Sequence, residues 1–214
     1  VIKVFKMSSI LSFVDHNKLR ITNYLLLPFS VVFFILSQLR VWFYKVGIFK
    51  VSQAEVPVIV VGNITIGGSG KTPIVITLCR YFESHNKSVG VVSRGYGGKY
   101  TQDTLKVTPL TDPKECGDEP ALIAQQTNAQ VVVAKRRSKA IKYLTSNDQV
   151  DIIISDDGLQ HYAMGRDLEI VVIDGIRRFG NGLLLPSGPL REPLKRLKSV
   201  DIVINNGCIV EGEI

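Results

Sequence analysis

Residues 62–73 read Gly-Asn-Ile-Thr-Ile-Gly-Gly-Ser-Gly-Lys-Thr-Pro, and this stretch decides the fold. It follows the apolar run Val56–Val61 and leads into a segment with a helical pattern. Glycines let a backbone curve closely around a phosphate with its N–H groups pointing inward, and a helix N-terminus adds favourable partial charge. Pro73 suits a first helical turn, where a backbone N–H has no partner within the helix. The stretch therefore predicts a phosphate-binding loop between a strand and a helix.

Two side chains of this loop have predicted roles. Lys71 is predicted as a catalytic residue, because it can reach the β- and γ-phosphates of a nucleotide, and the Thr72 hydroxyl can coordinate Mg²⁺. The usual spacing places a glycine six residues before the lysine, where this sequence has Thr65, while three later glycines keep the loop flexible. The alternative is a glycine-rich turn with an incidental lysine. The residues predicted to bind nucleotide are Asn63, Thr65, Gly67, Gly68, Ser69, Gly70, Lys71 and Thr72.

Beyond the loop, short runs rich in Val and Ile alternate with helical stretches. The runs are almost continuously apolar, as is typical of parallel strands that are covered on both faces. The expected strands are Val56–Val61, Ser88–Val92, Gln130–Ala134, Asp151–Ser155, Leu168–Ile173 and Asp201–Ile204. The expected helices are Thr72–Ser84, Asp118–Thr127 and Arg137–Thr145. This alternation predicts a three-layer α/β fold like that of P-loop nucleotide hydrolases, with a mostly parallel sheet and ligands at the carboxyl ends of its strands.

Two adjacent acids follow the run Asp151–Ser155. Asp156 and Asp157 stand where a P-loop enzyme holds Mg²⁺, and adjacent carboxylates repel each other unless a cation lies nearby. We predict Asp156 as a metal ligand and Asp157 as a catalytic residue, with an N-capping turn as the alternative. His161 is predicted to orient a carboxylate or to hydrogen-bond a phosphate, and the alternative is an ordinary surface or core histidine.

A second acidic motif opens the helix expected at Asp118–Thr127. Acids in a first helical turn are favoured by the helix dipole alone, which is the simpler explanation. The functional hypothesis is that Asp118 accepts the proton of a substrate hydroxyl and that Glu119 supports the metal, because phosphoryl transfer needs an oriented nucleophile more than a strong base. Arg94 and Arg191 lie in predicted loops and are weaker candidates for holding an anionic substrate group.

The N-terminal part differs in character, and we predict residues 1–50 as a basic, apolar membrane-associated segment and 51–214 as the kinase core. Tyr24–Leu36 is an uncharged run of 13 residues, shorter than the ~20 that cross a bilayer, and Pro28 is expected to interrupt it. Aromatic residues 42–44 lie between Arg40 and Lys45, a combination that suits the lipid headgroup region. We expect a helix that lies on the membrane and forms one wall of a lipid groove; a buried core helix and a single-pass span are the alternatives.

The distribution of charge supports this division. Residues 1–50 hold seven Lys or Arg residues and one acid, whereas residues 51–214 hold 19 basic and 18 acidic residues. A basic character confined to the apolar end indicates an anionic membrane surface as the partner, and the near-neutral core argues against nucleic acid. The cysteines Cys79, Cys116 and Cys208 form no CxxC pair, so reduced thiols in the cytosol are expected.

Taken together, these motifs resemble those of tetraacyldisaccharide 4'-kinase, an enzyme of lipid A biosynthesis. The matching stretches, in chain order, are LLLPFS, VGNITIGGSGKTP, VVSRGYGG, GDEP, SDDGLQH and RRFGNGLLLPSGPLREP, and they extend from about Leu25 to Asp201. The resemblance implies ATP as the donor, Mg²⁺ as the metal, and the 4'-hydroxyl of the lipid A disaccharide precursor as the acceptor, with lipid IVA as the product. It places the base on Asp118 and the Walker-type acid at Asp156 or Asp157.

The resemblance also implies a helix that contacts the membrane in a Gram-negative type of bacterium, so we expect the protein at the cytoplasmic face of the inner membrane. No obligate protein partner is inferred. A smaller C-terminal lobe with a further histidine is expected beyond residue 214, so the chain is expected to be C-terminally incomplete. Two other functions remain open. A membrane-associated nucleotide switch of the GTPase type would carry an N/T-K-x-D motif, which the sequence lacks, and a nucleic-acid-binding ATPase would need a basic core.

Overall fold

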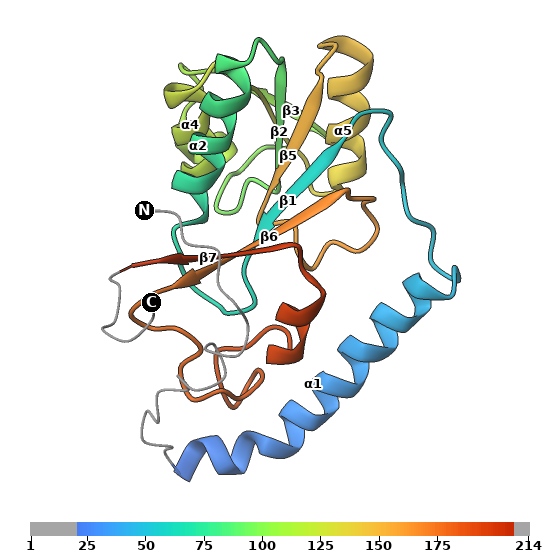
Figure 1. The fold of residues 1–214 in the computed structure, drawn as a ribbon, viewed down its shortest axis with the longest axis vertical. Helices are drawn as coiled ribbons and strands as arrows, with labels where there is room; N and C mark the ends of the chain where they lie inside the picture. Colours follow the sequence, from blue (N-terminus) through green and yellow to red (C-terminus); the bar gives the residue numbers. More distant parts are fainter. Residues whose placement is uncertain (1–20, 208–214) are drawn as a thin grey trace. The chain divides into compact units, whose positions relative to one another are not determined.

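The computed structural model describes residues 21–207 (Figure 1). The basic residues Lys3, Lys6, Lys18 and Arg20, and also Cys208, lie outside the described residues. The chain divides into two compact units. The larger unit comprises residues 51–62 and 71–169, and the described part of the smaller unit comprises residues 21–50, 63–70 and 170–207. The predicted domain boundary at residue 50 stays a prediction.

The larger unit is a sheet covered by helices. Its strands are β1 (Val58–Gly62), β2 (Val89–Ser93), β3 (Leu105–Val107), β4 (Gln130–Val133) and β5 (Ile152–Asp156). They lie in the order β3-β4-β2-β5-β1, and only β3 is antiparallel to its neighbour. Its helices are α2 (Lys71–Ser84), α3 (Pro113–Cys116), α4 (Asp118–Gln126) and α5 (Arg137–Asn147). Figure 1 shows α2 and α4 on one side of these strands and α5 on the other.

The apolar runs form the core for the reason that the sequence suggested. Every residue of β1 and of β2 is buried, because helices cover both faces and leave no polar side. A fully buried Val or Ile side chain contributes about 1.5–3 kcal/mol, so these strands account for much of the stability. In the register between β1 and β5, Val61 is the partner of Asp156. The carboxyl end of β1, where the glycine loop begins, therefore lies beside the acid at the end of β5.

The smaller unit contains the remaining elements. These are helix α1 (Ile21–Lys45), most of strand β6 (Leu168–Asp174), the 3-10 helix η2 (Leu194–Ser199) and strand β7 (Ile202–Asn206). Strands β6 and β7 are parallel. The full strand order of the sheet is β3-β4-β2-β5-β1-β6-β7. The mostly parallel α/β fold predicted from the alternating pattern is thus confirmed.

The elements differ from the predictions at β3, at α3, at η2, which was not predicted, and at Pro28. The short edge strand β3 and helix α3 lack a strong periodic pattern and were not predicted. The expectation that Pro28 interrupts the N-terminal segment is wrong, because α1 runs for 25 residues with Pro28 inside it. A proline removes one helical hydrogen bond, and the apolar residues after it continue the helix. The part Asn23–Lys45 is long and apolar enough to cross a membrane, judged by length and composition.

Candidate functional site

The larger unit holds a buried lysine beside an acid. Lys71 is the first residue of α2 and is only 6% exposed, and its Nζ lies 3.5 Å from Oδ1 of Asp157. Asp157 directly follows β5 and has a φ of +48°, a left-handed conformation that is uncommon outside glycine. Such conformations cluster at functional sites. The structure therefore brings together Lys71 and Asp157, two of the residues that the sequence predicted as catalytic.

Asp156 is the most deeply buried acid at this site. It is 0% exposed, and neither of its carboxylate oxygens has a hydrogen-bond partner within residues 21–207. The pKa of Asp156 is raised to about 7, mainly by burial and also by the negative charges of Glu119 and Asp157, while the positive charges of Lys71 and Arg137 oppose the shift. Because burial disfavours the ionised form of Asp156, a cation bound beside its unpaired oxygens would stabilise the carboxylate.

Arg137 holds the backbone of both acids, and the sequence did not single it out. Its guanidinium Nη2 donates hydrogen bonds of 2.9 Å to the backbone carbonyl of Asp156 and of 2.9 Å to that of Asp157. Arg137 is 6% exposed, and burial lowers its pKa while the two acids raise it. Its position in the sequence could have indicated this role, because Arg137 follows the predicted strand β4, and the carboxyl ends of parallel strands meet at the edge of the sheet where ligands bind.

The loop after β2 packs on the start of α4 and thereby joins two separate motifs. The backbone N–H of Tyr100 donates to the carbonyl of Glu115 at 3.2 Å, and a Cβ added to Gly117 would lie 2.6 Å from the carbonyl oxygen of Tyr96. Asp118 follows as the first residue of α4, and its side chain is exposed. Glycine at 117 thus allows the loop after β2 to approach the backbone closely, and this contact fixes the position of Asp118 at the start of α4.

The outcomes for the three remaining candidates of the larger unit differ. Glu119 lies close enough to Asp156 to raise its pKa, and the exposed Arg94 close enough to lower the pKa of Arg137. His161 lies in the loop after β5 and is half-buried. The roles predicted for these side chains, and for Asp118, stay predictions.

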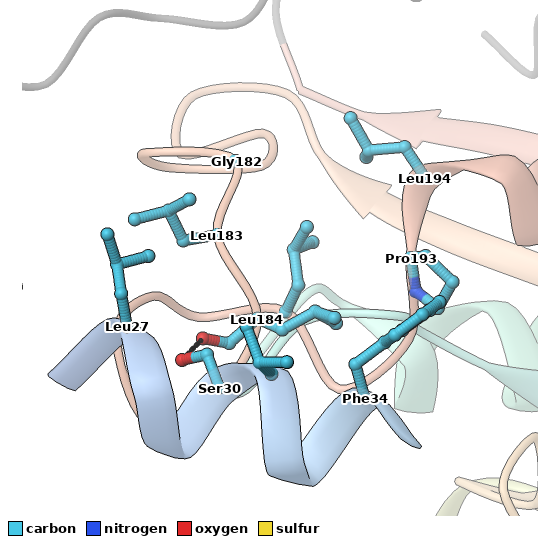
Figure 2. A pocket seen from close by; sticks show the side chains of 10 residues that line it. Leu27, Ser30, Phe34, Gly182, Leu183, Leu184, Pro193 and Leu194 are labelled. Atoms are coloured by element: carbon cyan, nitrogen blue, oxygen red, sulfur yellow. Dashed lines mark hydrogen bonds between the residues drawn. The ribbon is translucent and has the colours of Figure 1, made fainter. Parts of the chain in front are cut away.

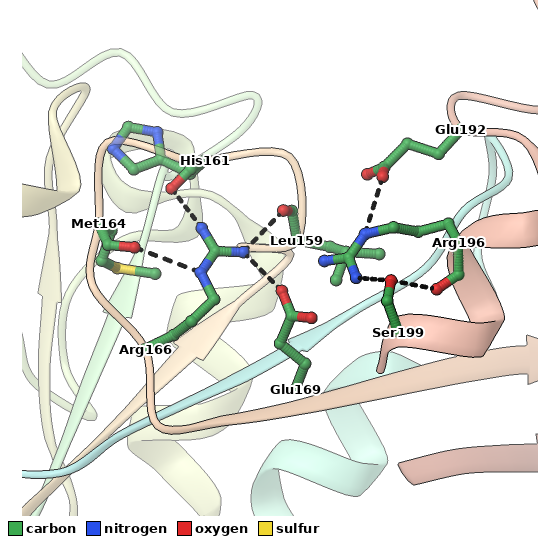
Figure 3. A network of polar contacts seen from close by, with 8 residues as sticks. All are labelled: Leu159, His161, Met164, Arg166, Glu169, Glu192, Arg196 and Ser199. Atoms are coloured by element: carbon green, nitrogen blue, oxygen red, sulfur yellow. Dashed lines mark hydrogen bonds and ion pairs between the residues drawn. The ribbon is translucent and has the colours of Figure 1, made fainter. Parts of the chain in front are cut away.

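Arg166 holds the loop that carries His161 (Figure 3). Its guanidinium donates to the backbone carbonyls of Leu159 at 2.9 Å, of His161 at 2.6 Å and of Met164 at 3.2 Å. It also forms an ion pair of 2.9 Å with Glu169. Arg166 thus links three carbonyls of this loop to Glu169 near the start of β6.

Residues 63–70 of the glycine loop belong to the smaller unit, and the first half of this stretch pairs with the segment 189–192. Thr65 forms an antiparallel bridge with Leu190, and the N–H groups of Ile66 and Arg191 donate to the carbonyls of Pro189 and Ile64 at 2.8 and 2.7 Å. This pairing explains why a residue other than glycine stands at position 65, since an extended strand-like residue needs no special backbone freedom. Arg191 is thereby tied to the loop through its backbone.

An apolar cavity lies between α1 and residues 182–194 of the smaller unit (Figure 2). It has a volume of about 390 Å³. Its lining is Leu27, Ser30, Val31, Phe34, Gly182, Leu183, Leu184, Leu190, Pro193 and Leu194. Ser30 is the one polar side chain of this lining, and its hydroxyl donates to the carbonyl of Leu184 at 2.9 Å. The cavity can therefore accept hydrocarbon but offers little to a polar ligand.

The acids in the described part of the chain do not form a preassembled metal site. Within residues 21–207, no group of three or more His, Cys, Asp or Glu side chains is placed to hold a metal ion. Mg²⁺ in phosphoryl-transfer sites uses only one or two carboxylates and takes its other ligands from phosphates and water. The unpaired carboxylate oxygens of Asp156 are ligands of the kind that such an ion uses, and Thr72 follows Lys71 as the second residue of α2.

Replacing Asp156 by asparagine should flatten the pH dependence of stability. The folded-state pKa of about 7 lies above the ordinary value of 3.8, so between these values the folded protein holds more protons than the unfolded chain. The free energy of unfolding then falls as the pH rises through this window, by up to about 4 kcal/mol. The introduced asparagine cannot ionise and should lose this contribution. Urea unfolding in EDTA at several pH values measures it, and equal slopes for Asp156→Asn and the parent would contradict it.

A buried lysine that begins a helix, beside acids at the end of the neighbouring strand, is the arrangement of P-loop nucleotide-binding proteins, and we assign the chain to this class. The family model of tetraacyldisaccharide-1-P 4'-kinase, LpxK, matches residues 22–213. The chain belongs to this family.

Individual relatives agree with the assignment. A tetraacyldisaccharide 4'-kinase of Ruthia magnifica subsp. Calyptogena magnifica is 60% identical over 193 residues, which cover 90% of this chain and 61% of that protein. A tetraacyldisaccharide 4'-kinase of Haemophilus influenzae is 54% identical over 184 residues, which cover 86% of this chain and 55% of that protein. A crystal structure of the "apo" form of LpxK from Aquifex aeolicus in complex with ATP aligns with a TM-score of 0.79 at 33% identity, covering 90% of this chain and 63% of that one. The chain spans about three fifths of the length of the curated relatives it matches.

Proposed function

We propose that the protein transfers the γ-phosphate of ATP to the 4'-hydroxyl of a tetraacylated glucosamine disaccharide, the lipid A precursor, and so produces lipid IVA. The observation that supports this most is the buried pair of Lys71 and Asp157 next to the unpaired carboxylate of Asp156. Family membership gives the substrate class, and the Aquifex relative was solved with ATP.

Each residue has a definite part in the proposed reaction. The ammonium of Lys71 neutralises charge on the phosphate oxygens as it shifts towards the leaving group. The exposed carboxylate of Asp118 accepts the proton of the sugar hydroxyl while the oxygen of that hydroxyl bonds to the γ-phosphorus. The bond between the γ-phosphorus and its bridging oxygen breaks, and ADP leaves with the electron pair. Arg137 keeps Asp156 and Asp157 in place through their carbonyls.

Magnesium would be held by Asp156 and the Thr72 hydroxyl, with Glu119 supporting the site through its charge. Mg²⁺ supplies charge neutralisation between the β- and γ-phosphates when it is bound. The raised pKa of Asp156 fits this role, because a carboxylate with no partner among the described residues gains the most from a cation.

The cavity beside α1 suits the acyl chains of the acceptor. Its ten lining residues include Leu27, Phe34 and Leu183 and no charged side chain. Burying hydrocarbon against such a surface contributes about 25 cal/mol per Å². An acylated acceptor should therefore bind more tightly than its deacylated counterpart, while the phosphoryl-transfer residues treat both alike.

Helix α1 is proposed to lie on an anionic membrane, at the cytoplasmic face of the inner membrane. Most of its large apolar side chains are exposed, among them Phe29, Ile35 and Leu36, which does not fit a buried core helix. Its opposite face is tied to the protein, because Ser30 is buried and bonds Ser187 at 2.8 Å. A helix anchored to its own unit in mid-length suits the membrane surface better than a span.

Acidic substitutions on the exposed face of α1 should weaken membrane binding. We expect the double variant Ile35→Glu, Leu36→Glu to lose at least about tenfold in affinity for vesicles, since each buried aliphatic side chain contributes about 1.5–3 kcal/mol. Co-sedimentation with vesicles of phosphatidylethanolamine and phosphatidylglycerol measures this. Leu110→Glu is the control, because Leu110 is 96% exposed on the larger unit. Equal losses in both variants would argue against α1 as the contact.

The proposed function is tested by following the label of γ-³²P-ATP. Full-length protein should transfer the label to the tetraacyldisaccharide, more slowly to a deacylated disaccharide at the same concentration, and not at all without Mg²⁺. A nucleotide switch would release the label as inorganic phosphate and leave both acceptors unlabelled. That result would overturn the proposal.

A further inference from the structure

Three successive backbone carbonyls of the glycine loop are held by side chains of the smaller unit. The Asn63 side-chain amide donates to the carbonyl of Gly67 at 3.3 Å. The Arg177 guanidinium donates to the carbonyl of Gly68, and Nδ2 of Asn206 donates to the carbonyl of Ser69 at 3.1 Å. Arg177 and Asn206 were not among the candidate residues that the sequence singled out.

The orientation of these carbonyls fixes that of the next N–H groups along the chain. In a planar trans peptide the C=O and the next N–H point in opposite directions. With the carbonyls of residues 67–69 turned towards the side chains, the N–H groups of Gly68, Ser69 and Gly70 point away from them. No acceptor within residues 21–207 takes a hydrogen bond from these N–H groups. The loop thus presents three successive unpaired donors.

A second observation points to a ligand at the same place. The Ser69 side chain is 2% exposed, and its hydroxyl has no hydrogen-bond partner among the described residues. A buried hydroxyl without a hydrogen-bond partner destabilises the folded protein, and a hydrogen bond to a phosphate oxygen would remove this penalty. Asn206 also lies directly against Gly70, where an added Cβ would overlap its Nδ2, and Gly70 has a φ of +76°.

Arg177 and Asn206 are themselves held in place by other parts of the smaller unit. Arg177 is itself fixed by Asp174, whose Oδ2 accepts from its Nε at 3.0 Å and its Nη2 at 2.8 Å. Asn206 is the last residue of β7, and its pairing with Asp174 in the strand register fixes its backbone. Asn206 and the Asp174 that holds Arg177 therefore stand at the carboxyl ends of neighbouring parallel strands.

We propose that Asn206 and Arg177 are positioning residues that set the loop for the phosphates of the nucleotide, by holding the carbonyls of Ser69 and Gly68 away from it. The inference rests on the proposed use of ATP, and it adds residues beyond the phosphate-loop motif. Asn206 acts through Ser69 and Gly70 and touches no reacting atom. Its loss should weaken the binding of phosphates and leave the binding of the nucleoside unchanged.

Two variants of Asn206 separate this role from a general loss of stability. Asn206→Ala removes the donor, and we expect the Kd of full-length protein for Mg·ATP to rise about 3- to 10-fold, the range of one hydrogen bond. Asn206→Asp keeps the size but turns a carboxylate oxygen towards the Ser69 carbonyl, so the Kd should rise more than in Asn206→Ala. A purely structural role would rank the isosteric aspartate as the milder change.

The measurement is calorimetric titration with Mg·ATP and with adenosine, alongside the thermal unfolding temperature. Asn205→Ala is the matched control: Asn205 precedes Asn206 on β7, faces the other side of the strand, and its Oδ1 has no partner within residues 21–207. We expect the Kd for adenosine to stay within about twofold in all variants. If both Asn206 variants kept the parental Kd for Mg·ATP, or if their affinities for Mg·ATP and for adenosine fell equally, the role of Asn206 would be wrong while the proposed function could still hold. A parent protein that binds no ATP would overturn the proposed function as well.

Discussion

Replacing Lys71 by alanine is expected to lower the rate of phosphoryl transfer severely. Lys71 is only 6% exposed beside Asp157, and its removal takes a buried positive charge away from the phosphates and from the neighbouring acid. Loss of one preorganised group of this kind lowers kcat by about 10²- to 10³-fold. Initial rates with the tetraacyldisaccharide at saturating ATP measure the effect, together with the Kd for Mg·ATP, which should also rise.

Lys139→Ala provides the matched control. Lys139 is 42% exposed and pairs with Asp103, which is 81% exposed, so the same charge is removed from the same unit without touching the buried acids. Its kcat should stay within about twofold, as expected for an exposed ion pair. A Lys71→Ala protein that is folded and transfers phosphate at the rate of the Lys139→Ala protein would show that the buried lysine plays no part in transfer.

Replacing Asp118 by asparagine is expected to lower kcat while ATP binding stays intact. Asparagine keeps the shape at the start of α4 but cannot take the proton of the sugar hydroxyl, a role that contributes about 10²- to 10⁴-fold. Asp118 is exposed, and its charge is not among those that shift the pKa of Asp156, so the Kd for Mg·ATP should change by less than about twofold. Single-turnover kinetics and nucleotide titration separate the two effects.

The control for Asp118 is Glu115→Gln, which neutralises an exposed acid in the adjacent helix α3. Its kcat should match that of the parent. If Asp118→Asn kept a parental kcat, another group would have to accept the proton. If it lost ATP binding and kcat together, Asp118 would belong to the nucleotide site instead.

The sequence predicted those parts of the fold that depend on local pattern. The buried runs at β1, β5 and β6 were found to within two residues, because continuous apolar character reports burial on both faces. The three-residue strand β3 was not predicted, since it is half-exposed and gains its conformation from pairing with β4. The interruption expected at Pro28 does not occur, because continuation of a helix past one proline depends on the residues after it.

The candidate site divides in the same way. Lys71 and Asp157 could be found because a motif fixes each of them beside a strand end, and the sheet then brings the two together. Arg137 and Asn206 act on backbone carbonyls that are 19 and 137 residues away in the sequence. Nothing local marks such residues, because their partners are main-chain atoms that every residue has. Only the structure shows that Arg137 and Asn206 hold the backbone of the acids and of the glycine loop through hydrogen bonds.

The destination of the γ-phosphate is the most direct test of the proposed function. Full-length protein is incubated with Mg·ATP and the tetraacyldisaccharide, and the recovered lipid is examined by ³¹P NMR with correlation to the sugar protons. We predict a new phosphomonoester coupled to the proton at the 4' position of the distal sugar, in an amount equal to the ADP formed. ADP formed together with inorganic phosphate, and a lipid with no new phosphorus signal, would contradict the proposal.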